Sequence, residues 1–341
     1  MTQRVFVVVT SIFAPSDCMV SIAQGATQHG WGFVAIGDSK SPADFQLDGC
    51  DYYSLARQLS MDLRFPLACP VGHYARKNIG YLAAIQSGAD LIVETDDDNV
   101  PLPSFWDPRT RVQVVPAVGN ADWVNVYRYF IDAHIWPRGF PLDAVRTLPP
   151  NIDTLNVETV DCPIQQGLAD GNPDVDAVYR LLMPLPVTFR PGRQIALRSG
   201  SWCPFNSQNT TWWRDTFPLL YLPAYCSFRM TDIWRGLVAQ RIAWANDWGV
   251  LFHGPSMRQE RNSHDLMKDF RDEVPGYLGN REIAELLWHV KIRPGVDNMC
   301  DNLRSCYDSL ARRGFVDPKE LDLLEIWLQD IASLTLDVGD R

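Results

Sequence analysis

Two apolar runs with a helical stretch between them constrain the fold of this chain more than any other feature. Residues 5–9 read Val-Phe-Val-Val-Val, and residues 33–36 read Phe-Val-Ala-Ile. Residues 17–29 have the character of a helix that Ser16 or Asp17 would cap and that Gly30 would end. A strand, a helix and a second strand joined by short connections form a βαβ unit, whose parallel strands are covered on both faces. The sequence therefore predicts an α/β fold with a mostly parallel central sheet.

A third apolar run, residues 91–93, leads toward three consecutive carboxylates, Asp96, Asp97 and Asp98. Adjacent carboxylates repel one another, so each raises the free-energy cost of ionising the next. Mg²⁺ or Mn²⁺ would relieve this repulsion, and phosphate oxygens would complete the shell because Mg²⁺ usually keeps only one or two protein carboxylates. The triplet therefore predicts a divalent metal together with a nucleoside diphosphate. A solvated acidic turn is the alternative, but ligands of open α/β sheets bind beyond the carboxyl ends of such strands.

Two neighbouring segments offer candidate contacts to a nucleotide. Arg76, Lys77 and Asn78 fall in the first turn of a predicted helix that Gly88 ends. Cations there oppose the helix dipole, and a diphosphate bound at the helix start would explain them. Asp38 follows the second strand, where it would either bind a base or ribose hydroxyl or serve only as a turn residue; its spacing favours neither role.

Longer motifs resemble a known family. An Arg-Lys-Asn-x-Gly helix followed by a strand that ends in Asp-Asp-Asp resembles the GT-A glycosyltransferases, in which an acidic Asp-x-Asp motif holds a divalent metal and the nucleotide-sugar. Four further stretches resemble the STELLO family, known from plant Golgi proteins and also found in bacteria and animals: residues 135–141, 165–176, 203–210 and 225–235. The resemblance covers most of the chain. It implies a GT-A-type, Rossmann-like sheet with helices on both faces and a C-terminal helical region.

The expected organisation follows from this reading. Residues 1–280 would form the catalytic domain, with a nucleotide-binding part at 1–110 and an acceptor and catalytic part at 111–280. Residues 281–341 carry helical apolar stripes and would form a helical region through which the chain could become a homo-oligomer. Within the acceptor part, alternation over 121–130 predicts a half-buried strand, and the Gly, Asp and Pro content of 165–176 predicts a loop.

The resemblance also implies roles for individual residues. Asp96 and Asp98 would hold the metal and the ribose or diphosphate, with support from Asp97. The implied nucleotide contacts are Thr10, Asp38, Arg76, Asn78, Asp96 and Asp97. Asp232 would be the catalytic base that takes the proton of the acceptor, although an Asp at the start of a helix is most commonly only its N-cap.

Two polar clusters complete the candidate site. Asn206, Gln208 and Asn209 carry amides, which both donate to and accept from sugar hydroxyls. Satisfaction of loop backbone is the alternative, and the sequence does not separate the two. The segment around Arg261 and His264 could close over the diphosphate, with Arg261 on phosphate oxygens, or it could be a surface loop. His264 or His253 would be a further metal ligand.

Composition excludes several classes of protein. The net charge is −10 and the pI about 5.0, without a basic stripe, so no nucleic-acid partner is expected. The eight cysteines form no Cys-x-x-Cys pair, which argues against structural zinc and fits reduced thiols. No apolar run is long enough to span a membrane. The chain therefore resembles a soluble, bacterial-like member without the plant N-terminal anchor, expected in the cytoplasm and possibly peripheral at the inner membrane.

The predicted function is metal-dependent transfer of a sugar from a nucleotide-sugar, a UDP-sugar in this reading, to a hydroxyl of a glycan or glycoconjugate. Direct displacement would invert the anomeric centre, and the pathway would be polysaccharide or glycoconjugate synthesis. One alternative is a nucleotidyltransferase that makes a nucleotide-sugar. The other is a catalytically silent scaffold of a polysaccharide-synthesis complex.

Overall fold

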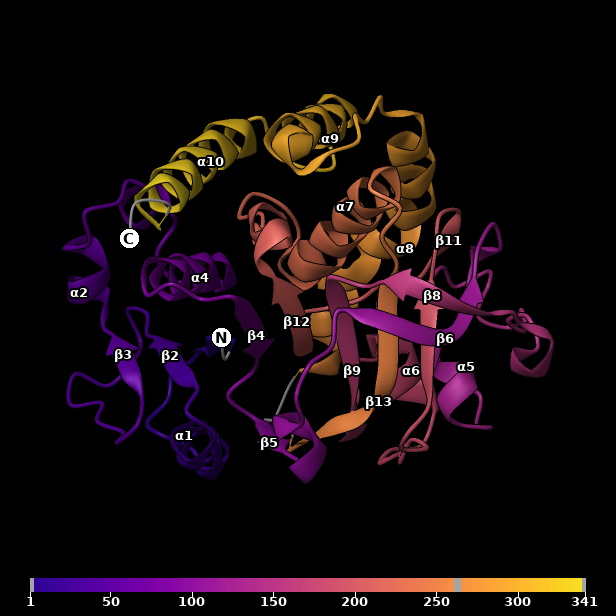
Figure 1. Ribbon diagram of the computed structural model, residues 1–341, viewed down its shortest axis with the longest axis horizontal. Coiled ribbons are helices and arrows are strands. Elements are labelled where there is room, and N and C mark those ends of the chain that lie inside the picture. The colour runs from indigo at the N-terminus through magenta and orange to yellow at the C-terminus, as the bar shows by residue number, and fades with distance from the viewer. Residues whose placement is uncertain (1–2, 261–264, 339–341) are drawn as a thin grey trace.

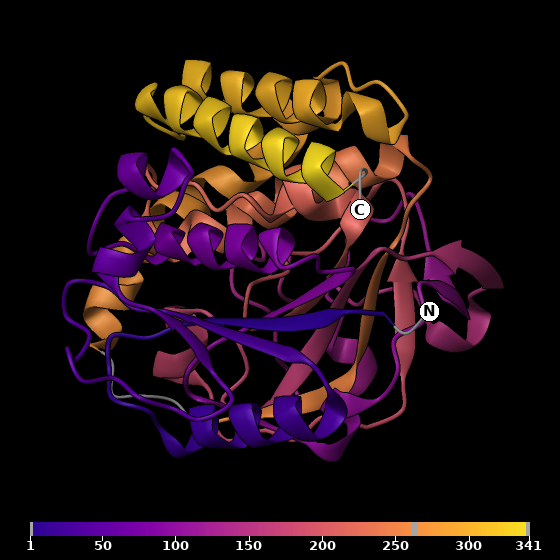
Figure 2. The same cartoon turned by 60° about the vertical axis from the view of Figure 1, so that its left-hand side comes forward.

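The computed structural model describes residues 3–260 and 265–338. Within that part of the chain, eleven strands form one sheet and two more form a small separate pair. The sheet lies between helices on both faces, as Figures 1 and 2 show. The predicted α/β class, with helices on both faces and a C-terminal helical region, is confirmed.

The N-terminal half of the sheet is entirely parallel. Its order is β3 (Asp51–Tyr53), β2 (Gly32–Ile36), β1 (Val5–Thr10) and β4 (Leu91–Thr95). Helix α1 (Asp17–His29) connects the first two strands as the sequence predicts. Ser16 is its N-cap, with Oγ accepting a hydrogen bond from the Met19 amide at 3.2 Å, and Gly30 ends it at a φ of 68°.

Beyond β4 the sheet is mixed. β12 (Asn209–Trp213) is antiparallel to both β4 and β9 (Ile164–Gly171), and β13 (Val250–Gln259) is parallel to β9. The remaining strands are β10 (Gln194–Leu197), β6 (Val112–Val118) and β8 (Val157–Asp161) at the far edge, β5 (Asn99–Pro101) beside the end of β13, and the separate pair β7 (Asp122–Trp123) and β11 (Ser201–Trp202).

Both faces of the sheet are buried, which explains why its strands are apolar throughout. Along β1, Val5, Val7 and Val9 belong to a core beneath α1, whereas Val8 belongs to the larger core on the opposite face. β4 divides in the same way, with Leu91 and Val93 on the α1 side and Ile92 on the other. An alternating pattern of apolar and polar residues is therefore absent from these strands.

Helices α4 (Lys77–Gln86) and α7 (Thr231–Ala245) cover the face opposite α1, and a further layer lies outside them. That layer consists of α9 (Met299–Arg313) and α10 (Lys319–Val338), drawn in yellow and orange in Figure 2. Helix α8 (Leu266–His289) packs between α7 and α6 (Ala177–Leu182), and it spans the predicted domain boundary at 280/281. No helix in the described ranges is both long enough and apolar enough to cross a membrane.

The remaining helical segments are short. They are α2 (Leu55–Leu59), α3 (Phe65–Ala68), α5 (Tyr127–Phe130) and the 3-10 turns η1 (Tyr74–Arg76), η2 (Pro103–Trp106), η3 (Ile152–Thr154), η4 (Arg214–Leu220), η5 (Phe228–Met230) and η6 (Val296–Asn298).

Two predicted segments differ from the structure. Residues 165–171 are not a loop but belong to β9, a central strand; a Cβ at Gly167 would lie 2.4 Å from Asn209 Nδ2, so this glycine permits close packing of neighbouring strands. Residues 121–130 are not one strand, because only β7 is extended and the chain then turns into α5. Tyr127, Tyr129 and Phe130 are all buried, so the alternation does not persist.

Candidate functional site

A cleft of about 840 Å³ opens at the carboxyl ends of the parallel strands β1, β2 and β4. Residues that follow these strands form one wall, and η5, the start of α7 and the start of α8 form the opposite wall. Aspartates dominate the lining: Asp38, Asp96, Asp97, Asp98, Asp174, Asp232, Asp265, Asp269 and Asp272. The lining cations that the structure describes are fewer: Lys40, Arg76, Arg138, Arg229 and Lys268. The cleft lies where the sequence places the ligand.

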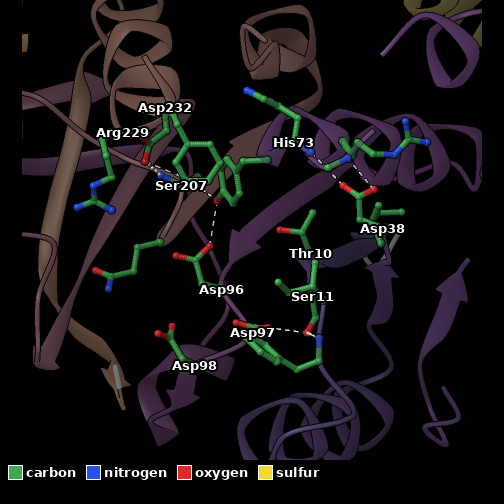
Figure 3. Close-up of a pocket in the computed structure, with 18 of the residues that line it drawn as sticks. Thr10, Ser11, Asp38, His73, Asp96, Asp97, Asp98, Ser207, Arg229 and Asp232 are labelled. Carbon is green, nitrogen blue, oxygen red and sulfur yellow. Dashed lines mark hydrogen bonds between the residues drawn. The ribbon is translucent and has the colours of Figure 1, made fainter. Parts of the chain in front are cut away.

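The three carboxylates after β4 have different surroundings, which Figure 3 shows. Asp96 accepts hydrogen bonds from the Tyr74 hydroxyl at 3.0 Å and from Lys77 Nζ at 3.1 Å. Asp97 turns toward Ser11, whose hydroxyl donates to it at 2.5 Å. Burial raises the pKa of Asp97, although the Ser11 hydrogen bond opposes this. Asp98 lies below Asp96 in the view of Figure 3, and its carboxylate accepts from Gln259 Nε2 at 3.2 Å.

Lys77 has a partner of its own within the protein. Its buried ammonium group carries three protons and lies within hydrogen-bond distance of four acceptors: the Thr95 and Ser207 carbonyls at 2.6 and 3.2 Å, Asp96 and the Tyr74 hydroxyl. The sequence predicts that a bound anion accounts for cations at the start of α4. For Lys77 that anion is the Asp96 carboxylate.

Asp232 lies in the first turn of α7, on the wall opposite Asp38 (Figure 3). Its Oδ2 accepts from Arg138 Nη2 at 2.8 Å, from the Ser207 amide at 3.2 Å and from the Ser207 hydroxyl at 3.3 Å. Burial on its own would raise the pKa of Asp232, but the charge and hydrogen bond of Arg138 hold it well below its usual range. Met230, not Asp232, occupies the N-cap position, so the capping role is not the one observed.

Arg138 therefore links two acids. It makes a bidentate pair with Asp174, with both nitrogen–oxygen distances 2.8 Å, in addition to its bond to Asp232. All three side chains are almost completely buried. A guanidinium shared by two carboxylates fixes both of them in place.

The predicted nucleotide contacts divide into two groups. Thr10 and Asp38 line the cleft, and Asp38 also accepts from the backbone amides of Gly72 and His73 at 2.9 and 3.0 Å, so it holds that loop. Arg76 is buried and its guanidinium bonds to Gln58 and to the Cys69 carbonyl.

Asn78 has an internal role. Both ends of its amide bond to the backbone of Leu222, at 2.8 and 2.9 Å. This residue ties α4 to the segment before η5, and its side chain is committed to that contact.

The three predicted sugar-binding amides also differ. Asn206 Oδ1 accepts from the backbone amide of Gln208, and Asn209 Nδ2 donates to the Leu168 carbonyl and the Ser256 hydroxyl. Both side chains therefore hold neighbouring segments of the protein together. The Gln208 side chain lines the cleft, and no hydrogen bond to its amide is found among the residues described. Gln208 is the amide available to a ligand.

Arg261 and His264 lie outside the described residues, so the predicted lid and third metal ligand have no structural account. Within the described ranges no group of three or more His, Cys, Asp or Glu side chains has the arrangement of a metal centre. The oxygen donors of Asp96 and Asp98 nevertheless suit Mg²⁺ or Mn²⁺, which take few protein carboxylates and share the rest of their shell with water and phosphate.

Sequence reasoning missed several residues of the cleft. Tyr74 and Ser207 join its two walls, Arg138 orders Asp232, and Phe13 and Phe228 are about half exposed at its lining. Arg138 and Ser207 lie inside the stretches 135–141 and 203–210 that carry the family resemblance, which is a signal that could have marked them.

The fold and the site define the chain as an α/β protein with an acid-rich ligand cleft at the carboxyl ends of parallel strands. Residues 229–340 match the family model described as STELLO glycosyltransferases. Two proteins of Arabidopsis thaliana are named "Probable glycosyltransferase STELLO2" and "Probable glycosyltransferase STELLO1". Each is 28% identical to this chain over an alignment that covers 89% of it. The predicted resemblance is confirmed: the chain is similar to the STELLO glycosyltransferases over most of its length.

The chain matches less than half of the length of these two relatives. The chain spans 41% of the length of the first and 42% of the second. A solved structure titled "Crystal Structure of a Mycobacterial Protein" aligns with 82% of this chain and 74% of its own, with a TM-score of 0.40 and 10% identity.

Proposed function

We propose that the chain is a glycosyltransferase that moves a sugar from a nucleotide-sugar, a UDP-sugar in our proposal, to a hydroxyl group of a glycan or glycoconjugate. The observation that carries the proposal is the pairing of two acidic centres across one cleft. Asp96 and Asp98 lie beyond the end of β4, and Asp232 lies at the start of α7 on the other wall. The family resemblance gives the reaction class to which this arrangement belongs.

The charge of the cleft supports a divalent cation. Its aspartates outnumber its cations among the described residues, and Arg138 and Arg229 are already paired with acids. A diphosphate would be repelled unless positive charge came with it. Asp96 and Asp98 would hold Mg²⁺ or Mn²⁺, which when bound would neutralise charge developing on the leaving diphosphate.

Asp232 is the proposed catalytic base. Asp232 is ionised at neutral pH and can therefore accept a proton, although its pair with Arg138 lowers its pKa and makes it a weaker base than an ordinary carboxylate. As the acceptor oxygen bonds to the anomeric carbon, the bond to the diphosphate oxygen breaks and its electron pair leaves with the diphosphate. The proton of the acceptor hydroxyl passes to Asp232. One displacement from the opposite face inverts the anomeric centre.

Residues of this chain would also orient the substrates. Gln208 offers both a donor and an acceptor to sugar hydroxyls. Thr10 and Asp38 would contact the nucleotide at the ends of β1 and beyond β2. Phe228, four residues before Asp232, presents an apolar surface on the acceptor side.

The test is a transfer assay with UDP-sugars and glycan acceptors in Mn²⁺, comparing Asp232→Asn with the wild-type chain. Asn keeps the size of the side chain but cannot take the proton, so turnover should fall by about 10²-fold or more, whereas UDP affinity should change by no more than about fivefold. Asp247→Asn is the matched control, because Asp247 is exposed and pairs with Arg198 away from the cleft.

Other outcomes would contradict the proposal. Near-normal turnover of Asp232→Asn would remove its named base, and retention of anomeric configuration, observed by NMR, would exclude single displacement. Release of pyrophosphate from a nucleoside triphosphate would identify a nucleotidyltransferase. Absence of turnover with every donor, together with retained nucleotide binding, would favour a scaffold.

A further inference from the structure

A chain of hydroxyl groups joins the two acidic centres of the cleft. Tyr74 Oη lies 3.0 Å from Asp96 Oδ1 and 2.6 Å from Ser207 Oγ. Ser207 Oγ in turn lies 3.3 Å from Asp232 Oδ2. Figure 3 shows the connection from Asp96 toward Ser207 and Asp232. The hydroxyl groups of Tyr74 and Ser207 thus connect Asp96 on one wall of the cleft to Asp232 on the other.

The number of protons in this chain limits its arrangements. With both carboxylates ionised, the two hydroxyl groups supply two protons for three oxygen–oxygen contacts. The 2.6 Å contact between Tyr74 and Ser207 is too short to be left without a proton, so two arrangements remain. In one arrangement Tyr74 donates to Asp96, and Ser207 donates to the Tyr74 oxygen. In the other Tyr74 donates to Ser207, and Ser207 donates to Asp232. Rotation of two hydroxyl groups therefore moves one hydrogen bond from Asp96 to Asp232.

The rest of the site keeps each carboxylate bonded in both arrangements. When Tyr74 turns away, Asp96 still accepts from Lys77 Nζ at 3.1 Å. When the Ser207 hydroxyl turns away, Asp232 still accepts from the Ser207 amide at 3.2 Å and from Arg138 at 2.8 Å. Lys77 Nζ lies 2.9 Å from the Tyr74 oxygen and cannot accept a proton, which leaves the phenol proton for Asp96 or Ser207. Neither arrangement leaves a bare carboxylate.

We propose that Tyr74 and Ser207 are positioning residues that couple the metal-side carboxylate Asp96 to the proposed base Asp232. This inference rests on the proposed function. A cation at Asp96 favours the arrangement in which Tyr74 donates away from Asp96, and the Ser207 hydroxyl then orients Asp232. Donor loading on one wall thereby orders the carboxylate on the other wall.

The coupling can be measured by binding alone, in a double-mutant cycle. Ser207 makes no side-chain hydrogen bond to Asp96 but does line the cleft, so a cycle with Tyr74 is needed to separate an effect carried by the phenol from direct contact with the ligand. In Ser207→Ala the phenol loses its neutral acceptor and keeps Asp96 as its side-chain acceptor, which opposes metal binding. Calorimetric titration should show about fivefold weaker Mn²⁺·UDP binding, the typical worth of one hydrogen bond. In the Tyr74→Phe background the same substitution should change affinity by less than about twofold.

Tyr81→Phe is the matched control, because its phenol is buried and donates to Glu94 outside the cleft. Ser207→Ala should keep its full effect in that background. Ser207→Thr retains the hydroxyl and should restore affinity, and Ser207→Cys replaces Ser207→Ala if the latter does not fold. If Ser207→Ala weakens Mn²⁺·UDP binding by the same factor with Tyr74 present and in the Tyr74→Phe variant, the proposed coupling through Tyr74 is wrong. It is also wrong if Ser207→Ala weakens binding in neither. Failure of the wild-type chain to bind Mn²⁺·UDP would contradict the proposed function as well.

Discussion

The buried ion pair between Glu94 and Arg235 is the contact whose loss should cost most stability. Glu94 Oε1 accepts from Arg235 Nη2 at 2.8 Å and from Trp212 Nε1 at 2.8 Å, while Oε2 accepts from Arg235 Nη1 at 3.2 Å and from the Tyr81 hydroxyl. Both charged side chains are at most 1% exposed. Burial on its own lowers the pKa of Arg235, and the charge of Glu94 raises it above its usual value. The pair joins β4 to α7 behind the cleft.

Glu94→Gln removes the negative charge but keeps the shape, so it leaves a buried guanidinium without its carboxylate. Removal of one partner of a buried pair costs about 3 to 5 kcal/mol in the free energy of unfolding, a large fraction of the typical total. Urea denaturation followed by tryptophan fluorescence measures this loss, provided that the transitions monitored by fluorescence and circular dichroism coincide.

Glu325→Gln is the matched control, because Glu325 pairs with Arg304 with both side chains more than 40% exposed. Its cost should stay below about 1 kcal/mol. A double variant, Glu94→Leu with Arg235→Met, should recover most of the stability, since an apolar pair avoids the cost of burying charge. If Glu94→Gln costs no more than Glu325→Gln, the reasoning about this pair is wrong.

Three further substitutions test other contacts. Burial raises the pKa of Asp176 to about 7 from an ordinary 3.8. Between about pH 4 and pH 7 the native state therefore binds a proton that the unfolded state has lost, and the free energy of unfolding should fall as the pH rises through this range. Asp176→Asn should reduce this pH dependence, measured by urea unfolding. Lys77→Met leaves Asp96 without its ion pair and should cost about 3 kcal/mol in the same assay, part of which added Mn²⁺ should restore. A Cβ at Gly80 would lie 2.5 Å from Val8 Cγ1, so Gly80→Ala should destabilise by about 1 to 3 kcal/mol despite its higher helix propensity; no loss would show that α4 can shift on the sheet.

The sequence predicts the parts of this fold that local patterns determine. The βαβ unit, the Ser16 cap and the position of the cleft after β4 all follow from apolar runs, a capping residue and the rule that ligands bind at carboxyl strand ends. β9 escaped prediction because its glycine and aspartate content resembles a loop, whereas its burial depends on strands distant in sequence.

The individual site residues were harder to predict because their partners are distant in sequence. Arg76 and Asn78 carry groups suited to a nucleotide, but Gln58 and Leu222 engage them inside the fold. Lys77 meets Asp96 only after β4 pairs beside β1 and α4 packs on β1 and β2. Arg138 reaches Asp232 across 94 positions of sequence. Local spacing cannot contain these contacts, because tertiary packing creates them.

The most direct test of the account is the affinity for UDP with and without metal, measured by isothermal titration calorimetry. The cleft is rich in aspartate, so UDP should bind weakly in chelator and about tenfold or more tightly in Mn²⁺. Asp98→Ala should abolish that difference, whereas Asp247→Asn, at an exposed position outside the cleft, should preserve it. Equal UDP affinity with and without Mn²⁺ in the wild-type chain would contradict the proposal that Asp96 and Asp98 hold a metal for a nucleotide-sugar.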